Sequence, residues 1–154
     1  MASGKPALSI SLTTGVLLST LIGPAVANAD KRELVEMPPM MQDHMLANMR
    51  DHLMAIDEIL EQLAQGNVSA AASIAEERLG LSSLSLHGAD HMASVIPRAM
   101  GEIGTEMHRA ASRFAIIVQD AELDEDPNAE QKVYRALQEI TENCNACHQS
   151  YRVR

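Results

Sequence analysis

Apolar residues recur at intervals of three and four positions along four segments of the chain, which is the spacing of amphipathic α-helices. The first of these segments follows the Pro38-Pro39 pair and ends at Gly66. We therefore expect one long helix here. Its apolar stripe is predicted to consist of Leu46, Met49, Leu53, Ile56, Leu60 and Leu63.

Three further segments follow the same pattern. Asn67 and Ser69 are candidate N-caps for a second helix that closes near Gly80. Asp126-Pro127 has the form of an N-cap followed by proline at the first position of the last helix. The apolar positions of the three helices are Ile74 and Leu79; Ile103, Met107, Ala111, Phe114, Val118 and Ala121; and Val133, Leu137, Ile140, Cys144 and Cys147.

These elements predict an all-α fold, because no segment has the pattern of a strand. Four amphipathic helices with short first and last connections form an up-down-up-down antiparallel four-helix bundle. In that topology the start of the first helix and the C-terminus of the last helix lie at the same end. The middle connection, from Leu81 to Gly101, is long and irregular, and such a loop in a small domain is typically functional or mobile.

Residues 1–29 have the layout of a secretory signal peptide. Lys5 precedes an apolar stretch, and the Ala-Asn-Ala sequence at 27–29 is a small-x-small cleavage site. A retained membrane helix is the alternative, but the apolar stretch is shorter than the ~20 residues that a span requires. We expect export, cleavage after Ala29 and a single domain over residues 30–154 with no membrane attachment.

Composition narrows the range of partners. The mature chain would carry 21 acidic and 11 basic residues, a net charge of −10, because one lysine leaves with the signal peptide. A chain this acidic is a poor partner for nucleic acid and for anionic lipid. One Phe, two Tyr and no Trp are few aromatic residues for a core, which hints that something other than protein fills part of the centre.

Both cysteines lie close to the C-terminus, in the sequence Cys144-Asn-Ala-Cys147-His148. C-x-x-C-H is the spacing of covalent c-type haem attachment. Two thiols add to the haem vinyl groups, and the adjacent imidazole ligates the iron. On a helix, the three side chains lie within about one turn. The pattern predicts one covalent haem c, held by Cys144 and Cys147, with His148 as the proximal iron ligand.

Three other uses of a C-x-x-C pair fit the sequence less well. A thioredoxin-like redox centre occurs beside a strand in a βαβ unit, and no strand is predicted. A zinc site would need further ligands at zinc-finger spacing, which the chain does not offer. A disulfide would close a loop too short to stabilise the fold much.

The sequence CNACHQSYR at the end of a four-helix chain resembles the class II c-type cytochromes, namely cytochrome c-prime and its low-spin, six-coordinate relatives. Most c-type cytochromes carry C-x-x-C-H near the N-terminus, whereas this family carries it at the end of the last helix. The resemblance implies a periplasmic protein, often a homodimer, that transfers electrons or binds NO or CO. It also implies that Arg152 lies near the proximal imidazole, and it leaves the redox partner protein unidentified.

The sixth iron ligand decides between these two functions. Met45 flanks the predicted stripe near the start of the first helix, where the helix would face the haem. With Met45 on the iron, the site is six-coordinate and low-spin, which raises the potential and favours electron transfer. With Leu46 there instead, the site is open to NO or CO. The sequence favours Met45, and it predicts no enzyme activity beyond a weak peroxidase reaction.

The remaining methionines and histidines allow a second alternative. The first helix is rich in both residue types, which suit Cu(I), so a periplasmic copper-binding bundle is conceivable. We interpret the methionines as core or haem-packing residues instead. His87 and His91 are expected to be solvated, because Gly88 between them argues against a helical metal pair, and His52 and His108 are expected to be structural.

Overall fold

The computed structural model describes Met1, residues 30–123 and residues 126–154. The predicted signal peptide therefore lies outside the described residues, apart from Met1. Contacts divide the chain into two units, Met1–Asp30 and Lys31–Arg154, of which the second holds the helices. Among the described residues, no helix combines the length and the apolar character of a membrane span.

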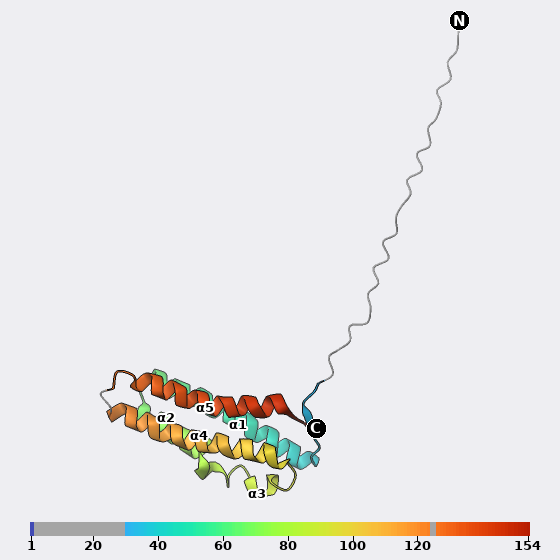
Figure 1. Cartoon of the computed structure of the whole chain (residues 1–154), viewed down its shortest axis with the longest axis horizontal. Helices are drawn as coiled ribbons and strands as arrows, with labels where there is room; N and C mark the ends of the chain where they lie inside the picture. Colours follow the sequence, from blue (N-terminus) through green and yellow to red (C-terminus); the bar gives the residue numbers. More distant parts are fainter. Residues whose placement is uncertain (2–29, 124–125) are drawn as a thin grey trace. The chain divides into compact units, whose positions relative to one another are not determined.

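The second unit is mostly helical, which confirms the all-α class (Figure 1). α4 packs against α5 and α2, and α1 packs against α2. The helical elements are α1 (Pro39–Ala64), α2 (Val68–Ile74), the π-helical turn η1 (Ala75–Leu79), the 3-10 turn η2 (Leu81–Ser83), α3 (Ala89–Met92), α4 (Arg98–Leu123) and α5 (Ala129–Ser150).

Most predicted helix boundaries are confirmed, and two need correction. α4 begins at Arg98, so the middle connection ends before the predicted Gly101 and contains η2 and α3. α5 begins at Ala129, with Asn128 rather than Asp126 at its N-cap. The Oδ1 atom of Asp126 accepts hydrogen bonds from the backbone N (2.8 Å) and the Nδ2 (3.0 Å) of Asn128, so this carboxylate stabilises the turn before the helix.

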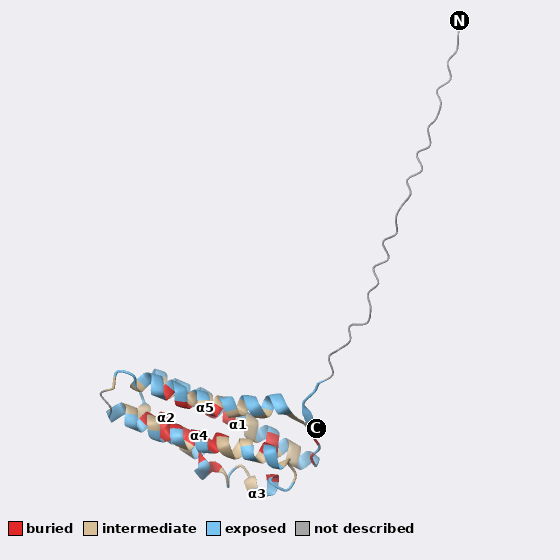
Figure 2. Cartoon of the chain, viewed as in Figure 1, coloured by how far each residue is buried: buried red, intermediate tan, exposed pale blue. Residues whose placement is uncertain are grey.

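The main hydrophobic cluster lies between α1, α2, η1, α4 and α5, and the buried residues of α4 and α5 lie on the sides that face the other helices (Figure 2). The predicted apolar positions of α4 and α5 are largely confirmed. The fully buried side chains include Ile59, Leu79, Phe114, Val118 and Ile140.

The predicted stripe of α1 was wrong by one position. Leu53 and Leu60, which were assigned to it, are 72% and 46% exposed, whereas Ala55 and Ile59 are fully buried. Ala55 joins an alanine-rich contact in which α1 packs on α2 and η1, and these in turn pack on α4; the short side chains let these neighbours approach closely. The predicted stripe was placed by its leucines, so it followed the neighbouring face of α1 and not the face that Ala55 buries. The other members of this contact are Ala71, Ala72, Ala75, Ala110 and Ala111.

Two short strands were not predicted. β1 (Glu33–Val35) pairs in parallel with β2 (Tyr151–Val153), in a register that places Leu34 opposite Arg152. The ladder continues beyond the strands, where Met37 N donates to Arg154 O and Arg154 N donates to Val35 O, both at 3.2 Å. Three-residue strands are too short to show a periodicity of two, and this pairing joins the first and last segments of the unit's sequence.

The central position of Phe114 leads to a stability prediction. Phe114→Ala should lower the free energy of unfolding by about 3–5 kcal/mol, because it removes a fully buried ring and leaves a cavity. Ile116→Ala on the same helix is the matched control, since Ile116 is 59% exposed, and it should change stability by less than about 1 kcal/mol. Denaturant unfolding of residues 30–154 measures both, and equal losses would contradict the assigned core.

Candidate functional site

The two cysteines lie on the inward face of α5, near its C-terminus. Ile140 is fully buried in the main cluster, and Cys144, one turn further along, packs against the same cluster. Cys147 packs against a second hydrophobic cluster. The sequence prediction that Ile140, Cys144 and Cys147 share one face is therefore confirmed.

The second cluster is dominated by methionine. Its buried members come from β1, the segment between β1 and α1, the start of α1, α3 and the start of α4; they are Val35, Met37, Met45, Met92 and Met100. Met45 is 9% exposed and its neighbour Leu46 is 37% exposed. Met45 therefore lies on the inward face of α1, in the same cluster that Cys147 contacts.

The two thiols are free and half-buried. Burial raises the pKa of Cys144. Burial also raises the pKa of Cys147, and the neighbouring Cys144 raises it further. Both side chains are therefore neutral thiols at physiological pH, and neither is activated as a thiolate nucleophile.

His148 follows Cys147 at the end of α5, and its side chain is exposed. The Nη1 of Arg32 donates to the backbone oxygen of His148 (3.3 Å). Arg152 lies in β2 and is partly buried. The segment before α1 thus contacts the chain at the C-terminal end of α5, through Arg32, and directly after it, through β1.

The donor set at this end fits a covalent haem. Cys144, Cys147 and His148 lie within an arc of about 100° on α5, as helical geometry requires at about 100° per residue. Two reduced thiols, an exposed imidazole and a buried thioether are the groups that thioether attachment and iron ligation use. The methionine side chains fill this end of the unit, so a haem there would replace contacts among them.

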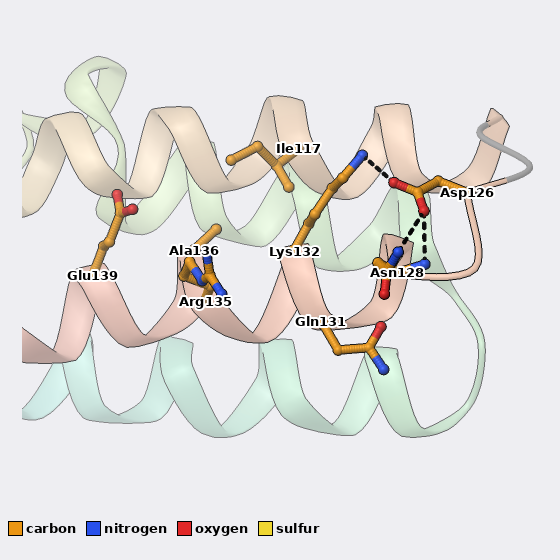
Figure 3. A pocket seen from close by; sticks show the side chains of 8 residues that line it. All are labelled: Ile117, Asp126, Asn128, Gln131, Lys132, Arg135, Ala136 and Glu139. Carbon is orange, nitrogen blue, oxygen red and sulfur yellow. Dashed lines mark hydrogen bonds and ion pairs between the residues drawn. The ribbon is translucent and has the colours of Figure 1, made fainter.

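The described surface has one hollow beside the second cluster and another along α5. One, of about 470 Å³, lies between the start of α1 and the middle connection and is lined in part by Met41, His44 and His91. The other, of about 600 Å³, lies along the first half of α5 (Figure 3). Three of its polar side chains are linked: Lys132 Nζ lies 2.7 Å from Asp126 Oδ2, and Asn128 Nδ2 donates to Asp126 Oδ1. Lys132 and Asn128 lower the pKa of Asp126 to about 2.

The sequence analysis missed one cluster, formed by His52, His87 and His108. A ring nitrogen from each histidine lies within 4.8 Å of those of the other two. His87 is partly buried, which corrects the expectation that it is solvated, whereas His91 is exposed as expected. The three residues are 35 and 21 positions apart in sequence, so no local spacing could have linked them.

Comparisons with protein-family models, with curated proteins and with solved structures found no significant match to this chain.

Val35 offers a test of how this end is held together. Val35→Asp would place a carboxylate in the second cluster, where Val35 is 4% exposed, and should loosen the β1–β2 pairing. Amide hydrogen exchange in residues 151–153 should then accelerate by about tenfold or more. Glu33→Ala changes an exposed residue of the same strand and should leave these rates unchanged. Equal rates in both variants would show that Val35 does not hold the strands.

Proposed function

We propose that this protein is an exported c-type cytochrome that transfers electrons through one covalently attached haem. Cys144 and Cys147 would hold the haem through thioether bonds, and His148 would be the proximal iron ligand. Met45 would be the sixth ligand. We also propose that the protein is related to the class II c-type cytochromes that it resembles, that it is periplasmic, and that residues 1–29 are removed.

One observation carries this proposal. Both thiols of the C-x-x-C-H sequence lie on the inward face of α5, and one of them contacts the cluster that contains Met45. A thioredoxin-like centre would need an activated thiolate, and the pKa of both thiols is raised instead. A thioether on the opposite side of a C-x-x-C-H haem is one of the ligand pairs that c-type cytochromes use.

The proposed arrangement is an up-down-up-down four-helix bundle made of α1, α2 with η1, α4 and α5. The contacts of α1 with α2, α2 with α4 and α4 with α5 support it, as do the short connections before α2 and before α5. The haem end would then combine the start of α1 with the C-terminus of α5. The contacts of Met45 and Cys147 with one cluster agree with this arrangement.

The haem would supply one-electron redox chemistry, and the chain would set its conditions. Met45, Met92 and Met100 would exclude water from the haem, since all three are buried. A neutral thioether ligand raises the reduction potential relative to a second imidazole. Arg152 lies four residues beyond His148, and its guanidinium would add a positive charge near the proximal side. The redox partner would be another protein.

Two alternative functions can each be tied to particular residues. An open site that binds NO or CO would require an apolar residue to face the iron, and the greater burial of Met45 relative to Leu46 weighs against it. A copper protein could use the hollow near Met40, Met41, His44 and His91, where thioethers and imidazoles gather.

Haem attachment should stabilise the end of the unit that holds the methionine-rich second cluster. The double variant Cys144→Ser, Cys147→Ser, produced where wild type acquires haem, should melt about 5 °C or more below the holoprotein, because bound haem stabilises only the native state. The matched control is wild type produced without haem attachment, which should melt close to the double variant. A double variant that is as stable as the holoprotein would contradict the coupling.

The sixth ligand can be tested by absorption spectroscopy with and without CO. Wild type should be low-spin and unchanged by CO, whereas Met45→Leu should lose the low-spin spectrum and bind CO. Met41→Leu, a partly buried methionine beside the same cluster, is the matched control and should behave as wild type. A wild-type protein that is already high-spin and binds CO would favour the gas-binding alternative.

A further inference from the structure

Three histidine side chains from three different elements meet inside the helical unit. His52 belongs to α1, His108 belongs to α4, and His87 lies in the connection between η2 and α3. The ring centroids are 4.6 Å (His52 and His87), 5.3 Å (His87 and His108) and 5.6 Å (His52 and His108) apart. Both helix histidines are buried, at 8% and 7% exposed.

The backbone of the connection is fixed so that His87 stays over α1. The backbone oxygen of His87 accepts hydrogen bonds from Asn48 Nδ2 and from His44 Nε2, each at 2.9 Å. The next residue, Gly88, has φ 63°, and a Cβ there would lie 2.9 Å from His44 Nε2. Glycine thus allows both the left-handed turn and the close approach of the connection to α1.

The ring of His108 is held in a defined tautomer. Its Nδ1 lies 2.7 Å from the backbone oxygen of Leu79, which can only accept, so Nδ1 carries the hydrogen. The Nε2 of the neutral ring then keeps its lone pair. An imidazole that donates its other N–H to a backbone carbonyl is the usual arrangement of metal-binding histidine.

The hydrogen-bond contacts of His87 Nδ1 are long. His52 Nε2 and His87 Nδ1 are 3.4 Å apart. Ser83 Oγ also lies 3.4 Å from the Nδ1 of His87 and from the Nδ1 of His108. Protein hydrogen bonds of good geometry span about 2.7–3.2 Å, so His87 Nδ1 has only weak hydrogen-bond partners in this cluster.

The separation of one pair of nitrogens agrees with metal coordination. Two nitrogens bound at about 2.0–2.1 Å to one tetrahedral ion lie about 3.3–3.4 Å apart. The observed distance between His52 Nε2 and His87 Nδ1 is 3.4 Å. The spacing of this pair is therefore that of two ligands on one ion, and a ring nitrogen of His108 lies within 4.8 Å of theirs.

The charge around the cluster suits a cation. Burial lowers the pKa of all three histidines, that of His52 to about 4, so the rings are neutral at physiological pH. Asp51, beside His52, shares the guanidinium of Arg78 with Glu58, at 2.5 Å from each carboxylate. Two carboxylates against one guanidinium leave one negative charge, which would partly balance a bound ion.

We propose that His52, His87 and His108 form a binding site for one transition-metal ion, Zn²⁺ or Cu⁺. Three neutral imidazoles, with no carboxylate or thiolate among them, suit these ions better than Mg²⁺ or Ca²⁺. With Zn²⁺, water would occupy the fourth position. The site uses none of the residues proposed to hold the haem, so its test is independent of that assignment.

The test is metal binding by the purified mature protein, with haem attached if it is present. After removal of loosely bound metal with a chelator, the protein is titrated with Zn²⁺ and, anaerobically, with Cu⁺ against a chromogenic chelator. Zinc and copper are quantified separately from iron. We expect one ion per chain with a dissociation constant of about 1 µM or below. Zn K-edge absorption spectroscopy should show nitrogen ligands at about 2.0–2.1 Å.

Two variants locate the site. His87→Ala should weaken binding by about tenfold or more, and circular dichroism should confirm that it folds. His91→Ala is the matched control: His91 is an exposed histidine four residues along the same connection, and its loss should leave binding unchanged. If His87→Ala does not fold, His108→Gln takes its place.

Three results would overturn the proposal. The first is the absence of stoichiometric binding of either ion by wild type. The second is unchanged binding by the folded His87→Ala or His108→Gln variant. The third is loss of binding in His91→Ala, which would place the metal in the hollow lined by His44 and His91 instead.

Discussion

The arrangement of this protein depends on the continuous inward face of α5. The helical repeat that buries Ile140 in the main cluster also turns Cys144 and Cys147 inward over the next two turns. The same packing that stabilises the fold therefore fixes the position of both thiols. The helix would set the orientation of a haem attached there. The residue that follows Cys147, His148, would be its iron ligand.

The side of the candidate site that lies across from α5 depends on contacts between segments that are distant in sequence. β1 pairs with β2, and Val35 packs in the methionine-rich cluster with Met45, close to Cys147. Methionine fills irregular space and adapts to substitution. A cluster of this composition can give way to a large planar group more readily than one built from branched side chains. The proposed haem would take advantage of this adaptability at one end of the unit. The alanine-rich contact keeps α1, α2, η1 and α4 packed together.

Much of the fold could be predicted from the sequence, because helical periodicity is local. α4 and α5 were predicted with their buried faces, and Pro39 and Gly66 correctly marked the limits of α1. The face of α1 could not be predicted, since Ala55 is buried by close helix approach while Leu53 remains exposed. The C-x-x-C-H sequence identified the candidate site, but the histidine cluster and the β1–β2 pairing arise only from tertiary contacts.

The central claim is that Cys144 and Cys147 carry a covalent haem. The most direct measurement is the intact mass of the protein purified, under denaturing conditions, from the periplasm of a host that matures c-type cytochromes. The account predicts the mass of residues 30–154 plus one haem. The mass of the polypeptide alone, from a host that attaches haem to another c-type cytochrome in parallel, would contradict it.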